Sequence, residues 1–161
     1  MIQVFRSLPV AHSVHRVDDL PASVSKHRCE SVSLGWEERL KVRARRVSDA
    51  GFEFATALDR GHVLRAGDCF VFDHPPLVIR VVERPEPVLA IRPQTPREWA
   101  SFGYHIGNSH QPMMVADSEI VCADVPGMEQ ILRYHAIPFV REHRAFTPIG
   151  QLPHHRHQVT T

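Results

Sequence analysis

Short stretches in which apolar and polar residues alternate dominate the first half of the chain. This period of two occurs in residues 39–45 and 52–58, and further short strands fit residues 31–34, 69–72 and 77–83. Such alternation is typical of strands with one buried and one solvated face, and the Gly-containing segments between them are turn signals. We therefore expect the first half to form a small β-sandwich or a partly open barrel.

The stretch 39–45 stands apart because its polar positions are all basic. Arg39, Lys41, Arg43 and Arg45 would form one stripe along a strand. Such a stripe can contact a phosphate or an acidic partner, but more often it is simply the solvated side of a sheet. The sequence leaves both interpretations open.

The second half contains a clear helix signal. Thr95 is the expected N-cap, Pro96 takes the first helical position, and Glu98 lies at the capping-box position. Apolar residues then follow at helical spacing. Gly107 and Asn108 are the expected C-cap, because glycine and asparagine accept the left-handed conformation that ends many helices.

The order of the remaining signals suggests a fold. Segment 84–87 carries two prolines and is interpreted as a linker. Beyond it we expect strands over residues 88–92, 113–116, 119–123 and 137–146, and a second helix over residues 126–135 capped by Asp124. The resulting order βαββαβ is typical of a ferredoxin-like domain.

The predicted fold class is therefore α+β. We expect an N-terminal all-β domain over residues 1–84 and a ferredoxin-like domain over residues 85–149. Residues 150–161 show no periodicity and are expected to form a mobile tail that contains histidines.

Charge and cysteine usage narrow the possible functions. The chain has 19 Lys and Arg residues against 18 Asp and Glu residues, which argues against nucleic-acid binding. Cys29, Cys69 and Cys122 are widely spaced and odd in number, so reduced thiols in a cytoplasmic protein are expected. We find neither a signal peptide nor a run of roughly 20 apolar residues, and we expect no membrane association.

Histidines provide the candidate chemistry. The chain contains 12 of them, and two lie in the segment 104–110. Five residues turn a helix by about 140°, so His105 and His110 would not chelate one ion from an unbroken helix. His110 alone is a poor metal site, but two copies across a two-fold axis would make a good one. The alternative is a loop histidine held by hydrogen bonds.

A second group of histidines lies near the C-terminus. His154, His155 and His157 could add imidazole ligands to an open metal site, since imidazole suits Ni²⁺, Zn²⁺ and Cu²⁺. They could equally belong to a solvated polar tail. We find no nucleophile motif, no phosphate-binding loop and no general base beside these histidines, so we expect no catalytic residues and no enzyme activity.

Residues 104–110 read Tyr-His-Ile-Gly-Asn-Ser-His, which is similar to the motif Y-H-L-G-N-R-H of the UreE family of urease accessory proteins. The basic stretch 39–46, the turn 61–68 and the strand beginning at Pro87 come in the family's order. The chain therefore resembles a nickel metallochaperone over most of its length.

The resemblance implies a homodimer formed through the ferredoxin-like domain. It implies that His110 of both protomers binds Ni²⁺, that His154, His155 and His157 assist, and that Zn²⁺ or Cu²⁺ can also bind. The ion would pass to the urease accessory GTPase UreG and to the apo-urease accessory complex. The N-terminal domain would bind partner proteins.

Two departures from the family pattern and two rival functions remain. Ser109 replaces the usual arginine, which removes a charge but no ligand, and the tail is short with only three histidines. A small zinc-dependent hydrolase using the same histidines is the main alternative. An RNA-binding module is the other, because ferredoxin-like folds also serve that role.

Overall fold

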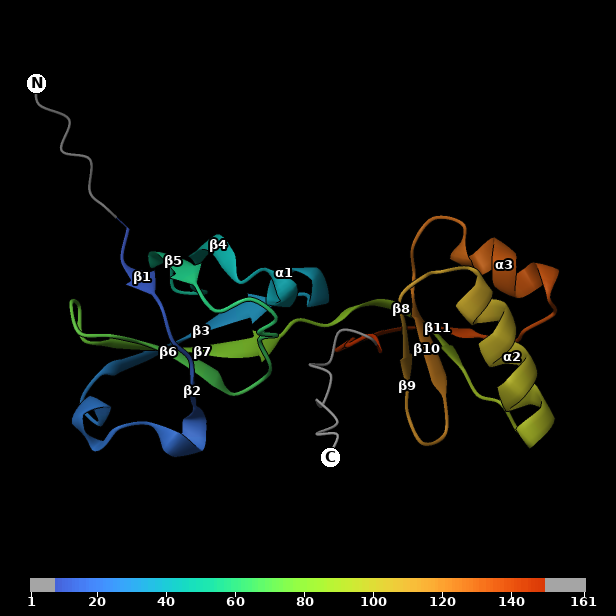
Figure 1. Ribbon diagram of the computed structural model, residues 1–161, viewed down its shortest axis with the longest axis horizontal. Helices are drawn as coiled ribbons and strands as arrows, with labels where there is room; N and C mark the ends of the chain where they lie inside the picture. The colour runs from blue at the N-terminus through green and yellow to red at the C-terminus, as the bar shows by residue number, and fades with distance from the viewer. Residues whose placement is uncertain (1–7, 150–161) are drawn as a thin grey trace, which may run out of the picture. The chain divides into compact units, whose positions relative to one another are not determined.

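The computed structural model describes residues 8–149, and the chain divides into two compact units between Glu83 and Arg84. The first unit consists mainly of strands, and the second sets two longer helices against a sheet (Figure 1). The predicted α+β class is confirmed.

The first unit contains two sheets. Its elements are β1 (Val10–Ala11), β2 (His15–Arg16), η1 (Val17–Asp19), η2 (Ala22–Val24), β3 (Arg28–Leu34), α1 (Trp36–Leu40), β4 (Arg43–Val47), β5 (Glu53–Ala57), β6 (Asp68–Phe72) and β7 (Leu77–Glu83). One sheet has the strand order β1-β5-β4 and the other β2-β6-β7-β3. The pairs β1–β5 and β3–β7 are parallel, and the other pairs are antiparallel.

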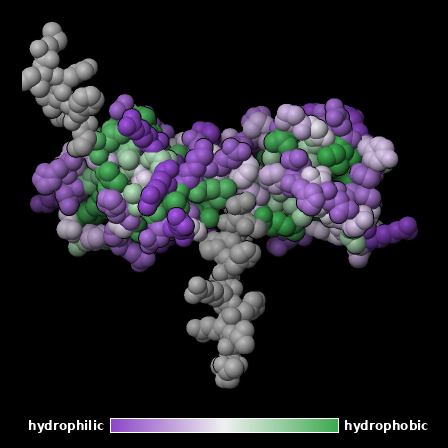
Figure 2. All heavy atoms as spheres, turned by 45° about the horizontal axis from the view of Figure 1, so that its top comes forward, coloured by the Kyte–Doolittle hydropathy of each residue, from purple (hydrophilic) through white to green (hydrophobic). Residues whose placement is uncertain are grey.

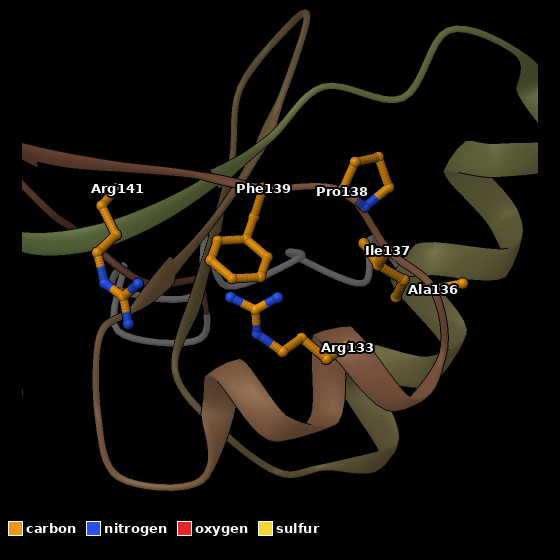
Figure 3. Close-up of a pocket in the computed structure, with 6 residues that line it drawn as sticks. All are labelled: Arg133, Ala136, Ile137, Pro138, Phe139 and Arg141. Carbon is orange, nitrogen blue, oxygen red and sulfur yellow. The ribbon is translucent and has the colours of Figure 1, made fainter.

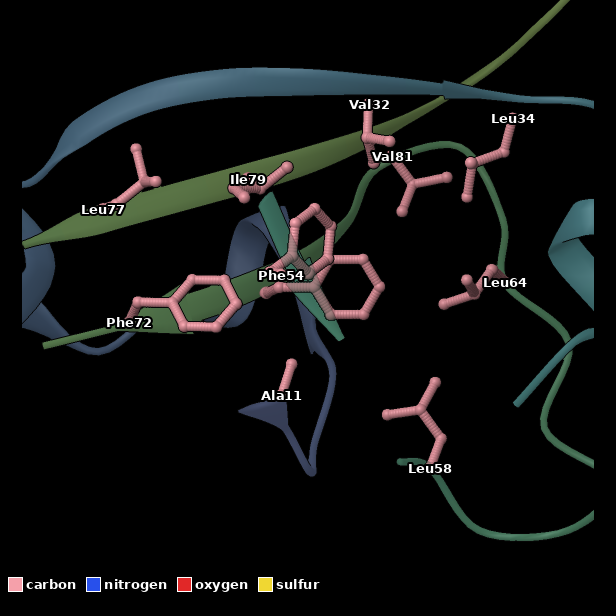
Figure 4. Close-up of a cluster of buried hydrophobic side chains, with 11 residues drawn as sticks. Ala11, Val32, Leu34, Phe54, Leu58, Leu64, Phe72, Leu77, Ile79 and Val81 are labelled. Atoms are coloured by element: carbon pink, nitrogen blue, oxygen red, sulfur yellow. The ribbon is translucent and has the colours of Figure 1, made fainter. Parts of the chain in front are cut away.

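The apolar faces of these two sheets form one core (Figure 4). At its centre, the Phe54 ring of β5 lies 5.5 Å from that of Phe70 and 5.6 Å from that of Phe72, centroid to centroid, both on β6. Phe54 and Phe70 are fully buried. Each contributes roughly 1.5–3 kcal/mol relative to an exposed ring. The packing of two sheets around this cluster agrees with the expected β-sandwich.

The expected strand over residues 39–45 is wrong in its first half. A short helix, α1, occupies this part of the chain, and β4 begins only at Arg43. The Glu38 carboxylate accepts a hydrogen bond from the Gly35 N–H at 3.0 Å, which supports the helix start. Arg39 is 2% exposed and pairs with Glu83 at 3.1 Å, so it does not belong to a solvated stripe. Lys41, Arg43 and Arg45 are exposed as expected.

The second unit has the predicted order βαββαβ. Its elements are β8 (Glu86–Ile91), α2 (Pro96–Asn108), β9 (Met113–Val115), β10 (Ile120–Ala123), α3 (Met128–Tyr134) and β11 (Val140–Arg144). All pairs in the sheet β11-β8-β10-β9 are antiparallel, as in a ferredoxin-like fold. Both helices lie side by side against this sheet (Figure 1). The core between them includes Leu89, Ile91, Ile106, Cys122, Met128 and Leu132.

Two boundary predictions in this unit are wrong. Strand β8 already begins at Glu86, inside the expected linker. Pro87 is tolerated because the ladder to β10 starts only at Val88, and the Pro87 carbonyl still accepts a hydrogen bond from the Asp124 N–H at 3.1 Å. Asp124 does not cap α3, whose N-cap is Gly127 with φ 92°. Asp124 instead accepts a hydrogen bond from Arg141 Nε at 3.2 Å.

Polar residues cover much of the surface visible in Figure 2. Cys29 is exposed, whereas Cys69 and Cys122 are buried. Burial raises the pKa of the Cys122 thiol to about 12, so this thiol stays protonated at neutral pH. In the described part of the chain, no helix combines the length and the apolar character needed to cross a bilayer.

Candidate metal centre

Helix α2 starts as the sequence predicts. The Thr95 hydroxyl accepts a hydrogen bond from the Glu98 N–H at 3.1 Å, and the Glu98 carboxylate accepts one from the Gln94 N–H at 2.6 Å. Ile106 is fully buried, and Trp99 and Phe102 pack against the same core. This apolar face fixes α2 on the sheet and thereby positions its C-terminal end.

The helix ends later than the sequence predicts. Gly107 and Asn108 remain helical, and Ser109 is the C-cap. The Ser109 hydroxyl donates a hydrogen bond to the Ile106 carbonyl at 2.6 Å, which satisfies a carbonyl at the open helix end. The left-handed residue is His110, with φ 55°, and its N–H donates to the Gly107 carbonyl at 3.1 Å. The predicted cap at Gly107 and Asn108 is therefore wrong.

The His110 side chain is open to solvent. Its residue is exposed, and within residues 8–149 no hydrogen bond or ion pair engages its imidazole. The alternative of a loop histidine held by side-chain hydrogen bonds therefore finds no support in this part of the chain. Both ring nitrogens are available to an external ligand.

The end of the described chain returns to this region. The Ile149 N–H donates a hydrogen bond to the Met113 carbonyl at 2.7 Å, and Met113 follows His110 by three positions. His154, five positions after Ile149, lies outside the described residues, as do His155 and His157. Five residues span at most about 18 Å, so the covalent chain allows His154 to reach the surroundings of His110.

His105 faces a different partner. Helix α2 continues past it to Asn108, and its imidazole stacks on that of His135, with ring centroids 3.8 Å apart. The sequence indicates His135 only as the last residue of the helix expected over residues 126–135. A signal for the pair was present, since Tyr-His occurs at 104–105 and again at 134–135, near the ends of two helices that a ferredoxin-like fold places side by side.

A pocket of about 780 Å³ in the second unit contains none of the predicted ligands (Figure 3). Arg133 and Arg141 line it, with their guanidinium groups 5.4 Å and 6.0 Å from the centroid of the Phe139 ring. Both arginines donate hydrogen bonds to the Glu129 carboxylate. These bonds lower the pKa of Glu129, and the bond from Arg141 has the larger effect. The pocket's positive charges are thus engaged within the protein.

Residues 8–149 bring together no group of three or more histidine, cysteine, aspartate or glutamate side chains suited to a metal ion. A complete site around His110 would therefore need ligands from outside this part of the chain.

Comparison with known proteins identifies the family. Residues 10–83 match the family profile of the UreE urease accessory protein N-terminal domain, and residues 86–160 match that of its C-terminal domain. Both profiles follow the two units of the structure. Together they cover most of the chain.

Individual relatives agree with these profiles. The urease accessory protein UreE of Burkholderia vietnamiensis is 36% identical over 106 residues, or 66% of this chain and 52% of the relative. The UreE of Bacillus sp. TB-90 is 32% identical over 80% of this chain and 86% of its own length. The UreE of Synechococcus sp. JA-3-3Ab is 38% identical over 75% of this chain and 80% of its own length.

The match spans about half the length of the Burkholderia relatives. All of these names describe an accessory protein and not an enzyme, in agreement with the sequence analysis. The chain belongs to the UreE family of urease accessory proteins.

Proposed function

We propose that the chain is a nickel metallochaperone that delivers Ni²⁺ to apo-urease during urease maturation. The observation that carries this proposal is the placement of His110. This exposed imidazole has no protein partner within residues 8–149, and it follows directly on a helix that the core holds in place. An imidazole presented in this way is a suitable ligand for Ni²⁺.

A homodimer completes the site in this proposal. A two-fold axis places identical residues opposite one another, so two His110 imidazoles can share one ion. The remaining coordination positions are filled by water or by tail histidines. Such exchangeable ligands suit a protein that must release its cargo.

The tail histidines His154, His155 and His157 assist in this proposal. The hydrogen bond between Ile149 and Met113 supports this role, because Ile149 is the last described residue before the tail and Met113 follows His110 by three positions. Three histidines suit transfer of one ion better than storage of many.

The two units have different roles in this proposal. Residues 85–149 bind the metal and form the dimer, whereas residues 1–84 contact partner proteins. These partners are the urease accessory GTPase UreG and the apo-urease accessory complex, in the cytoplasm. The exposed residues Lys41, Arg43 and Arg45 offer a basic surface for such contacts.

The alternative of a zinc-dependent hydrolase lacks a supporting observation. A hydrolytic zinc site needs an activated water and a group that accepts its proton. No carboxylate within residues 8–149 contacts the His110 imidazole. Urease accessory function is therefore the stronger proposal.

Calorimetric titration with Ni²⁺, combined with light scattering for mass, tests the proposal. We expect the wild-type chain to bind one tight ion per dimer and the His110→Ala variant to lose this event. Truncation after Pro153 should weaken binding, while the mass from light scattering still corresponds to a dimer of the shortened chain. His143→Ala, which removes an exposed histidine of β11, is the matched control and should bind like wild type.

Unchanged nickel binding by His110→Ala would reject the shared site. If truncation alone abolished binding, the tail would be the primary site and His110 would be a residue of the helix end.

A further inference from the structure

The stacked pair formed by His105 and His135 is a second group of potential metal ligands. His105 lies in the last turn of α2, and His135 follows α3 directly. Their imidazole centroids are 3.8 Å apart and their planes differ by 19°. Both residues are half-buried, so the pair is accessible from solvent.

Two tyrosines flank this pair. Tyr104 contacts His105 edge to face at 5.4 Å between ring centroids, and Tyr134 contacts His135 in the same way at 4.9 Å. The tyrosines themselves are 65% and 85% exposed. The two tyrosines are therefore exposed ring neighbours of the pair.

The ring nitrogens of the pair have no partners within the described chain. No hydrogen bond or ion pair between residues 8 and 149 engages either imidazole. A histidine with a purely structural role usually donates a ring N–H to a carbonyl or carboxylate. The nearest arginine in sequence, Arg133, pairs with Glu129 at 2.7 Å, so its charge is engaged elsewhere.

The separation of the rings is close to what one ion requires. Two imidazole nitrogens bound to the same ion at roughly 2.1 Å lie roughly 3.0–3.4 Å apart. The lone pairs of stacked rings do not converge, so at least one ring must turn out of the stack to share an ion with the other. Rotation about the last side-chain torsion provides this change, and that torsion is broad for histidine.

We propose that His105 and His135 of one protomer bind a divalent transition-metal ion, with water completing its coordination. This site is separate from the one proposed at His110 and needs neither a second protomer nor the tail. Because its two ligands come from the ends of α2 and α3, a bound ion links the two helices and stabilises the second unit.

Copper titration of a full-length variant isolates this site. In this background His110, His154, His155 and His157 are all replaced by alanine, and Cu²⁺ alone is the probe because it binds imidazole most strongly among these metals. We expect one Cu²⁺ per chain, with an electron paramagnetic resonance spectrum that shows two nitrogen ligands. Adding His135→Phe should weaken binding at least tenfold, since phenylalanine keeps the stacked ring but removes both nitrogens.

His143→Ala in the same background is the control and should leave the copper affinity unchanged. Circular dichroism melting in the absence of metal confirms that the His135→Phe variant is folded. Equal copper binding with and without His135→Phe, or no binding by the background variant, would overturn the proposal. Neither result bears on His110, which the nickel titration of the wild-type dimer tests separately.

Discussion

His110 adopts a backbone conformation that most residues avoid. Its φ of 55° lies in the left-handed region, where a side chain other than glycine costs roughly 1–2 kcal/mol. Histidine tolerates this region better than most residues, but glycine is the usual choice after a helix. A strained residue at an exposed position suggests that the imidazole is kept for function.

Replacing His110 by glycine or alanine should separate stability from metal binding. We expect His110→Gly to be more stable than His110→Ala by about 1 kcal/mol, because only glycine relieves the left-handed strain. Both variants should lose the nickel event equally. Urea unfolding without metal measures the first effect, and equal stability of the two variants would mean that the backbone relaxes at this position.

At this scale the sequence predicts the candidate ligand but not its setting. The motif in residues 104–110 singles out His110 because all of its residues are contiguous in the sequence. The sequence predicts a cap at Gly107 and Asn108, whereas the left-handed residue is His110, because the bond from the Ser109 hydroxyl to the Ile106 carbonyl has no sequence signature. The partner of His105 was missed because it lies on another helix.

Two buried arginines organise the segment between β3 and β4. The Arg39 guanidinium pairs with Glu83 of β7, and the Arg39 carbonyl accepts a hydrogen bond from the Leu64 N–H at 3.1 Å. Arg46 donates to the Glu38 carbonyl at 3.1 Å and to the Lys41 carbonyl at 2.7 Å, at the end of α1. Cations at a helix C-terminus are favourable, so α1 is held from both sides.

Removing the buried guanidinium of Arg39 should destabilise the first unit. We expect Arg39→Ala to lower the free energy of unfolding by about 2–3 kcal/mol, below the usual cost for a fully buried pair because Glu83 is partly exposed. The exposed Arg43→Ala should change it by less than about 0.5 kcal/mol. Urea unfolding of both variants measures the difference, and similar values would show that Arg39 is not a structural anchor.

The alternation of apolar and basic residues could not reveal helix α1. Residues 39–45 follow a period of two, and the same residues are compatible with a short helix when Glu38 bonds to the Gly35 N–H. Longer elements were predicted more reliably. The strand Leu77–Glu83 matches the structure because it is a short run rich in β-branched residues. The start of α2 matches because Thr95, Pro96 and Glu98 all indicate the same helix start.

Across the whole molecule, both units contain carboxylates whose charged form the fold stabilises. In the first unit, the Ser31 hydroxyl and the Ser33 N–H and hydroxyl donate to Asp49 and lower its pKa. In the second, hydrogen bonds from Arg141 and Arg133 lower the pKa of Glu129. A bond from Arg92 lowers that of Glu142 in the same way.

The chain should therefore lose stability in acid. A carboxyl group whose pKa is lower in the folded state stabilises the fold above its unfolded pKa, and this contribution is lost as the pH falls through the folded value. The loss should begin near pH 4.5, the ordinary pKa of glutamate, and deepen below it. Urea unfolding at a series of pH values measures the slope of the unfolding free energy against pH.

Glu129→Gln should make this slope shallower, whereas Glu53→Gln, at an exposed position of β5, should leave it unchanged. An unaltered slope in Glu129→Gln would mean that its arginine bonds add nothing to acid sensitivity.

The bond between Ile149 and Met113 has a consequence for how the proposed ligands respond to dilution. In the proposed site the tail histidines belong to the same chain as the His110 that they would assist, so their contribution would not depend on how much protein is present. The second His110 of the proposed site would come from another protomer and would be lost when dimers dissociate. Dilution would thus remove one kind of ligand and spare the other, leaving a monomer that still retains the ion weakly and can pass it on.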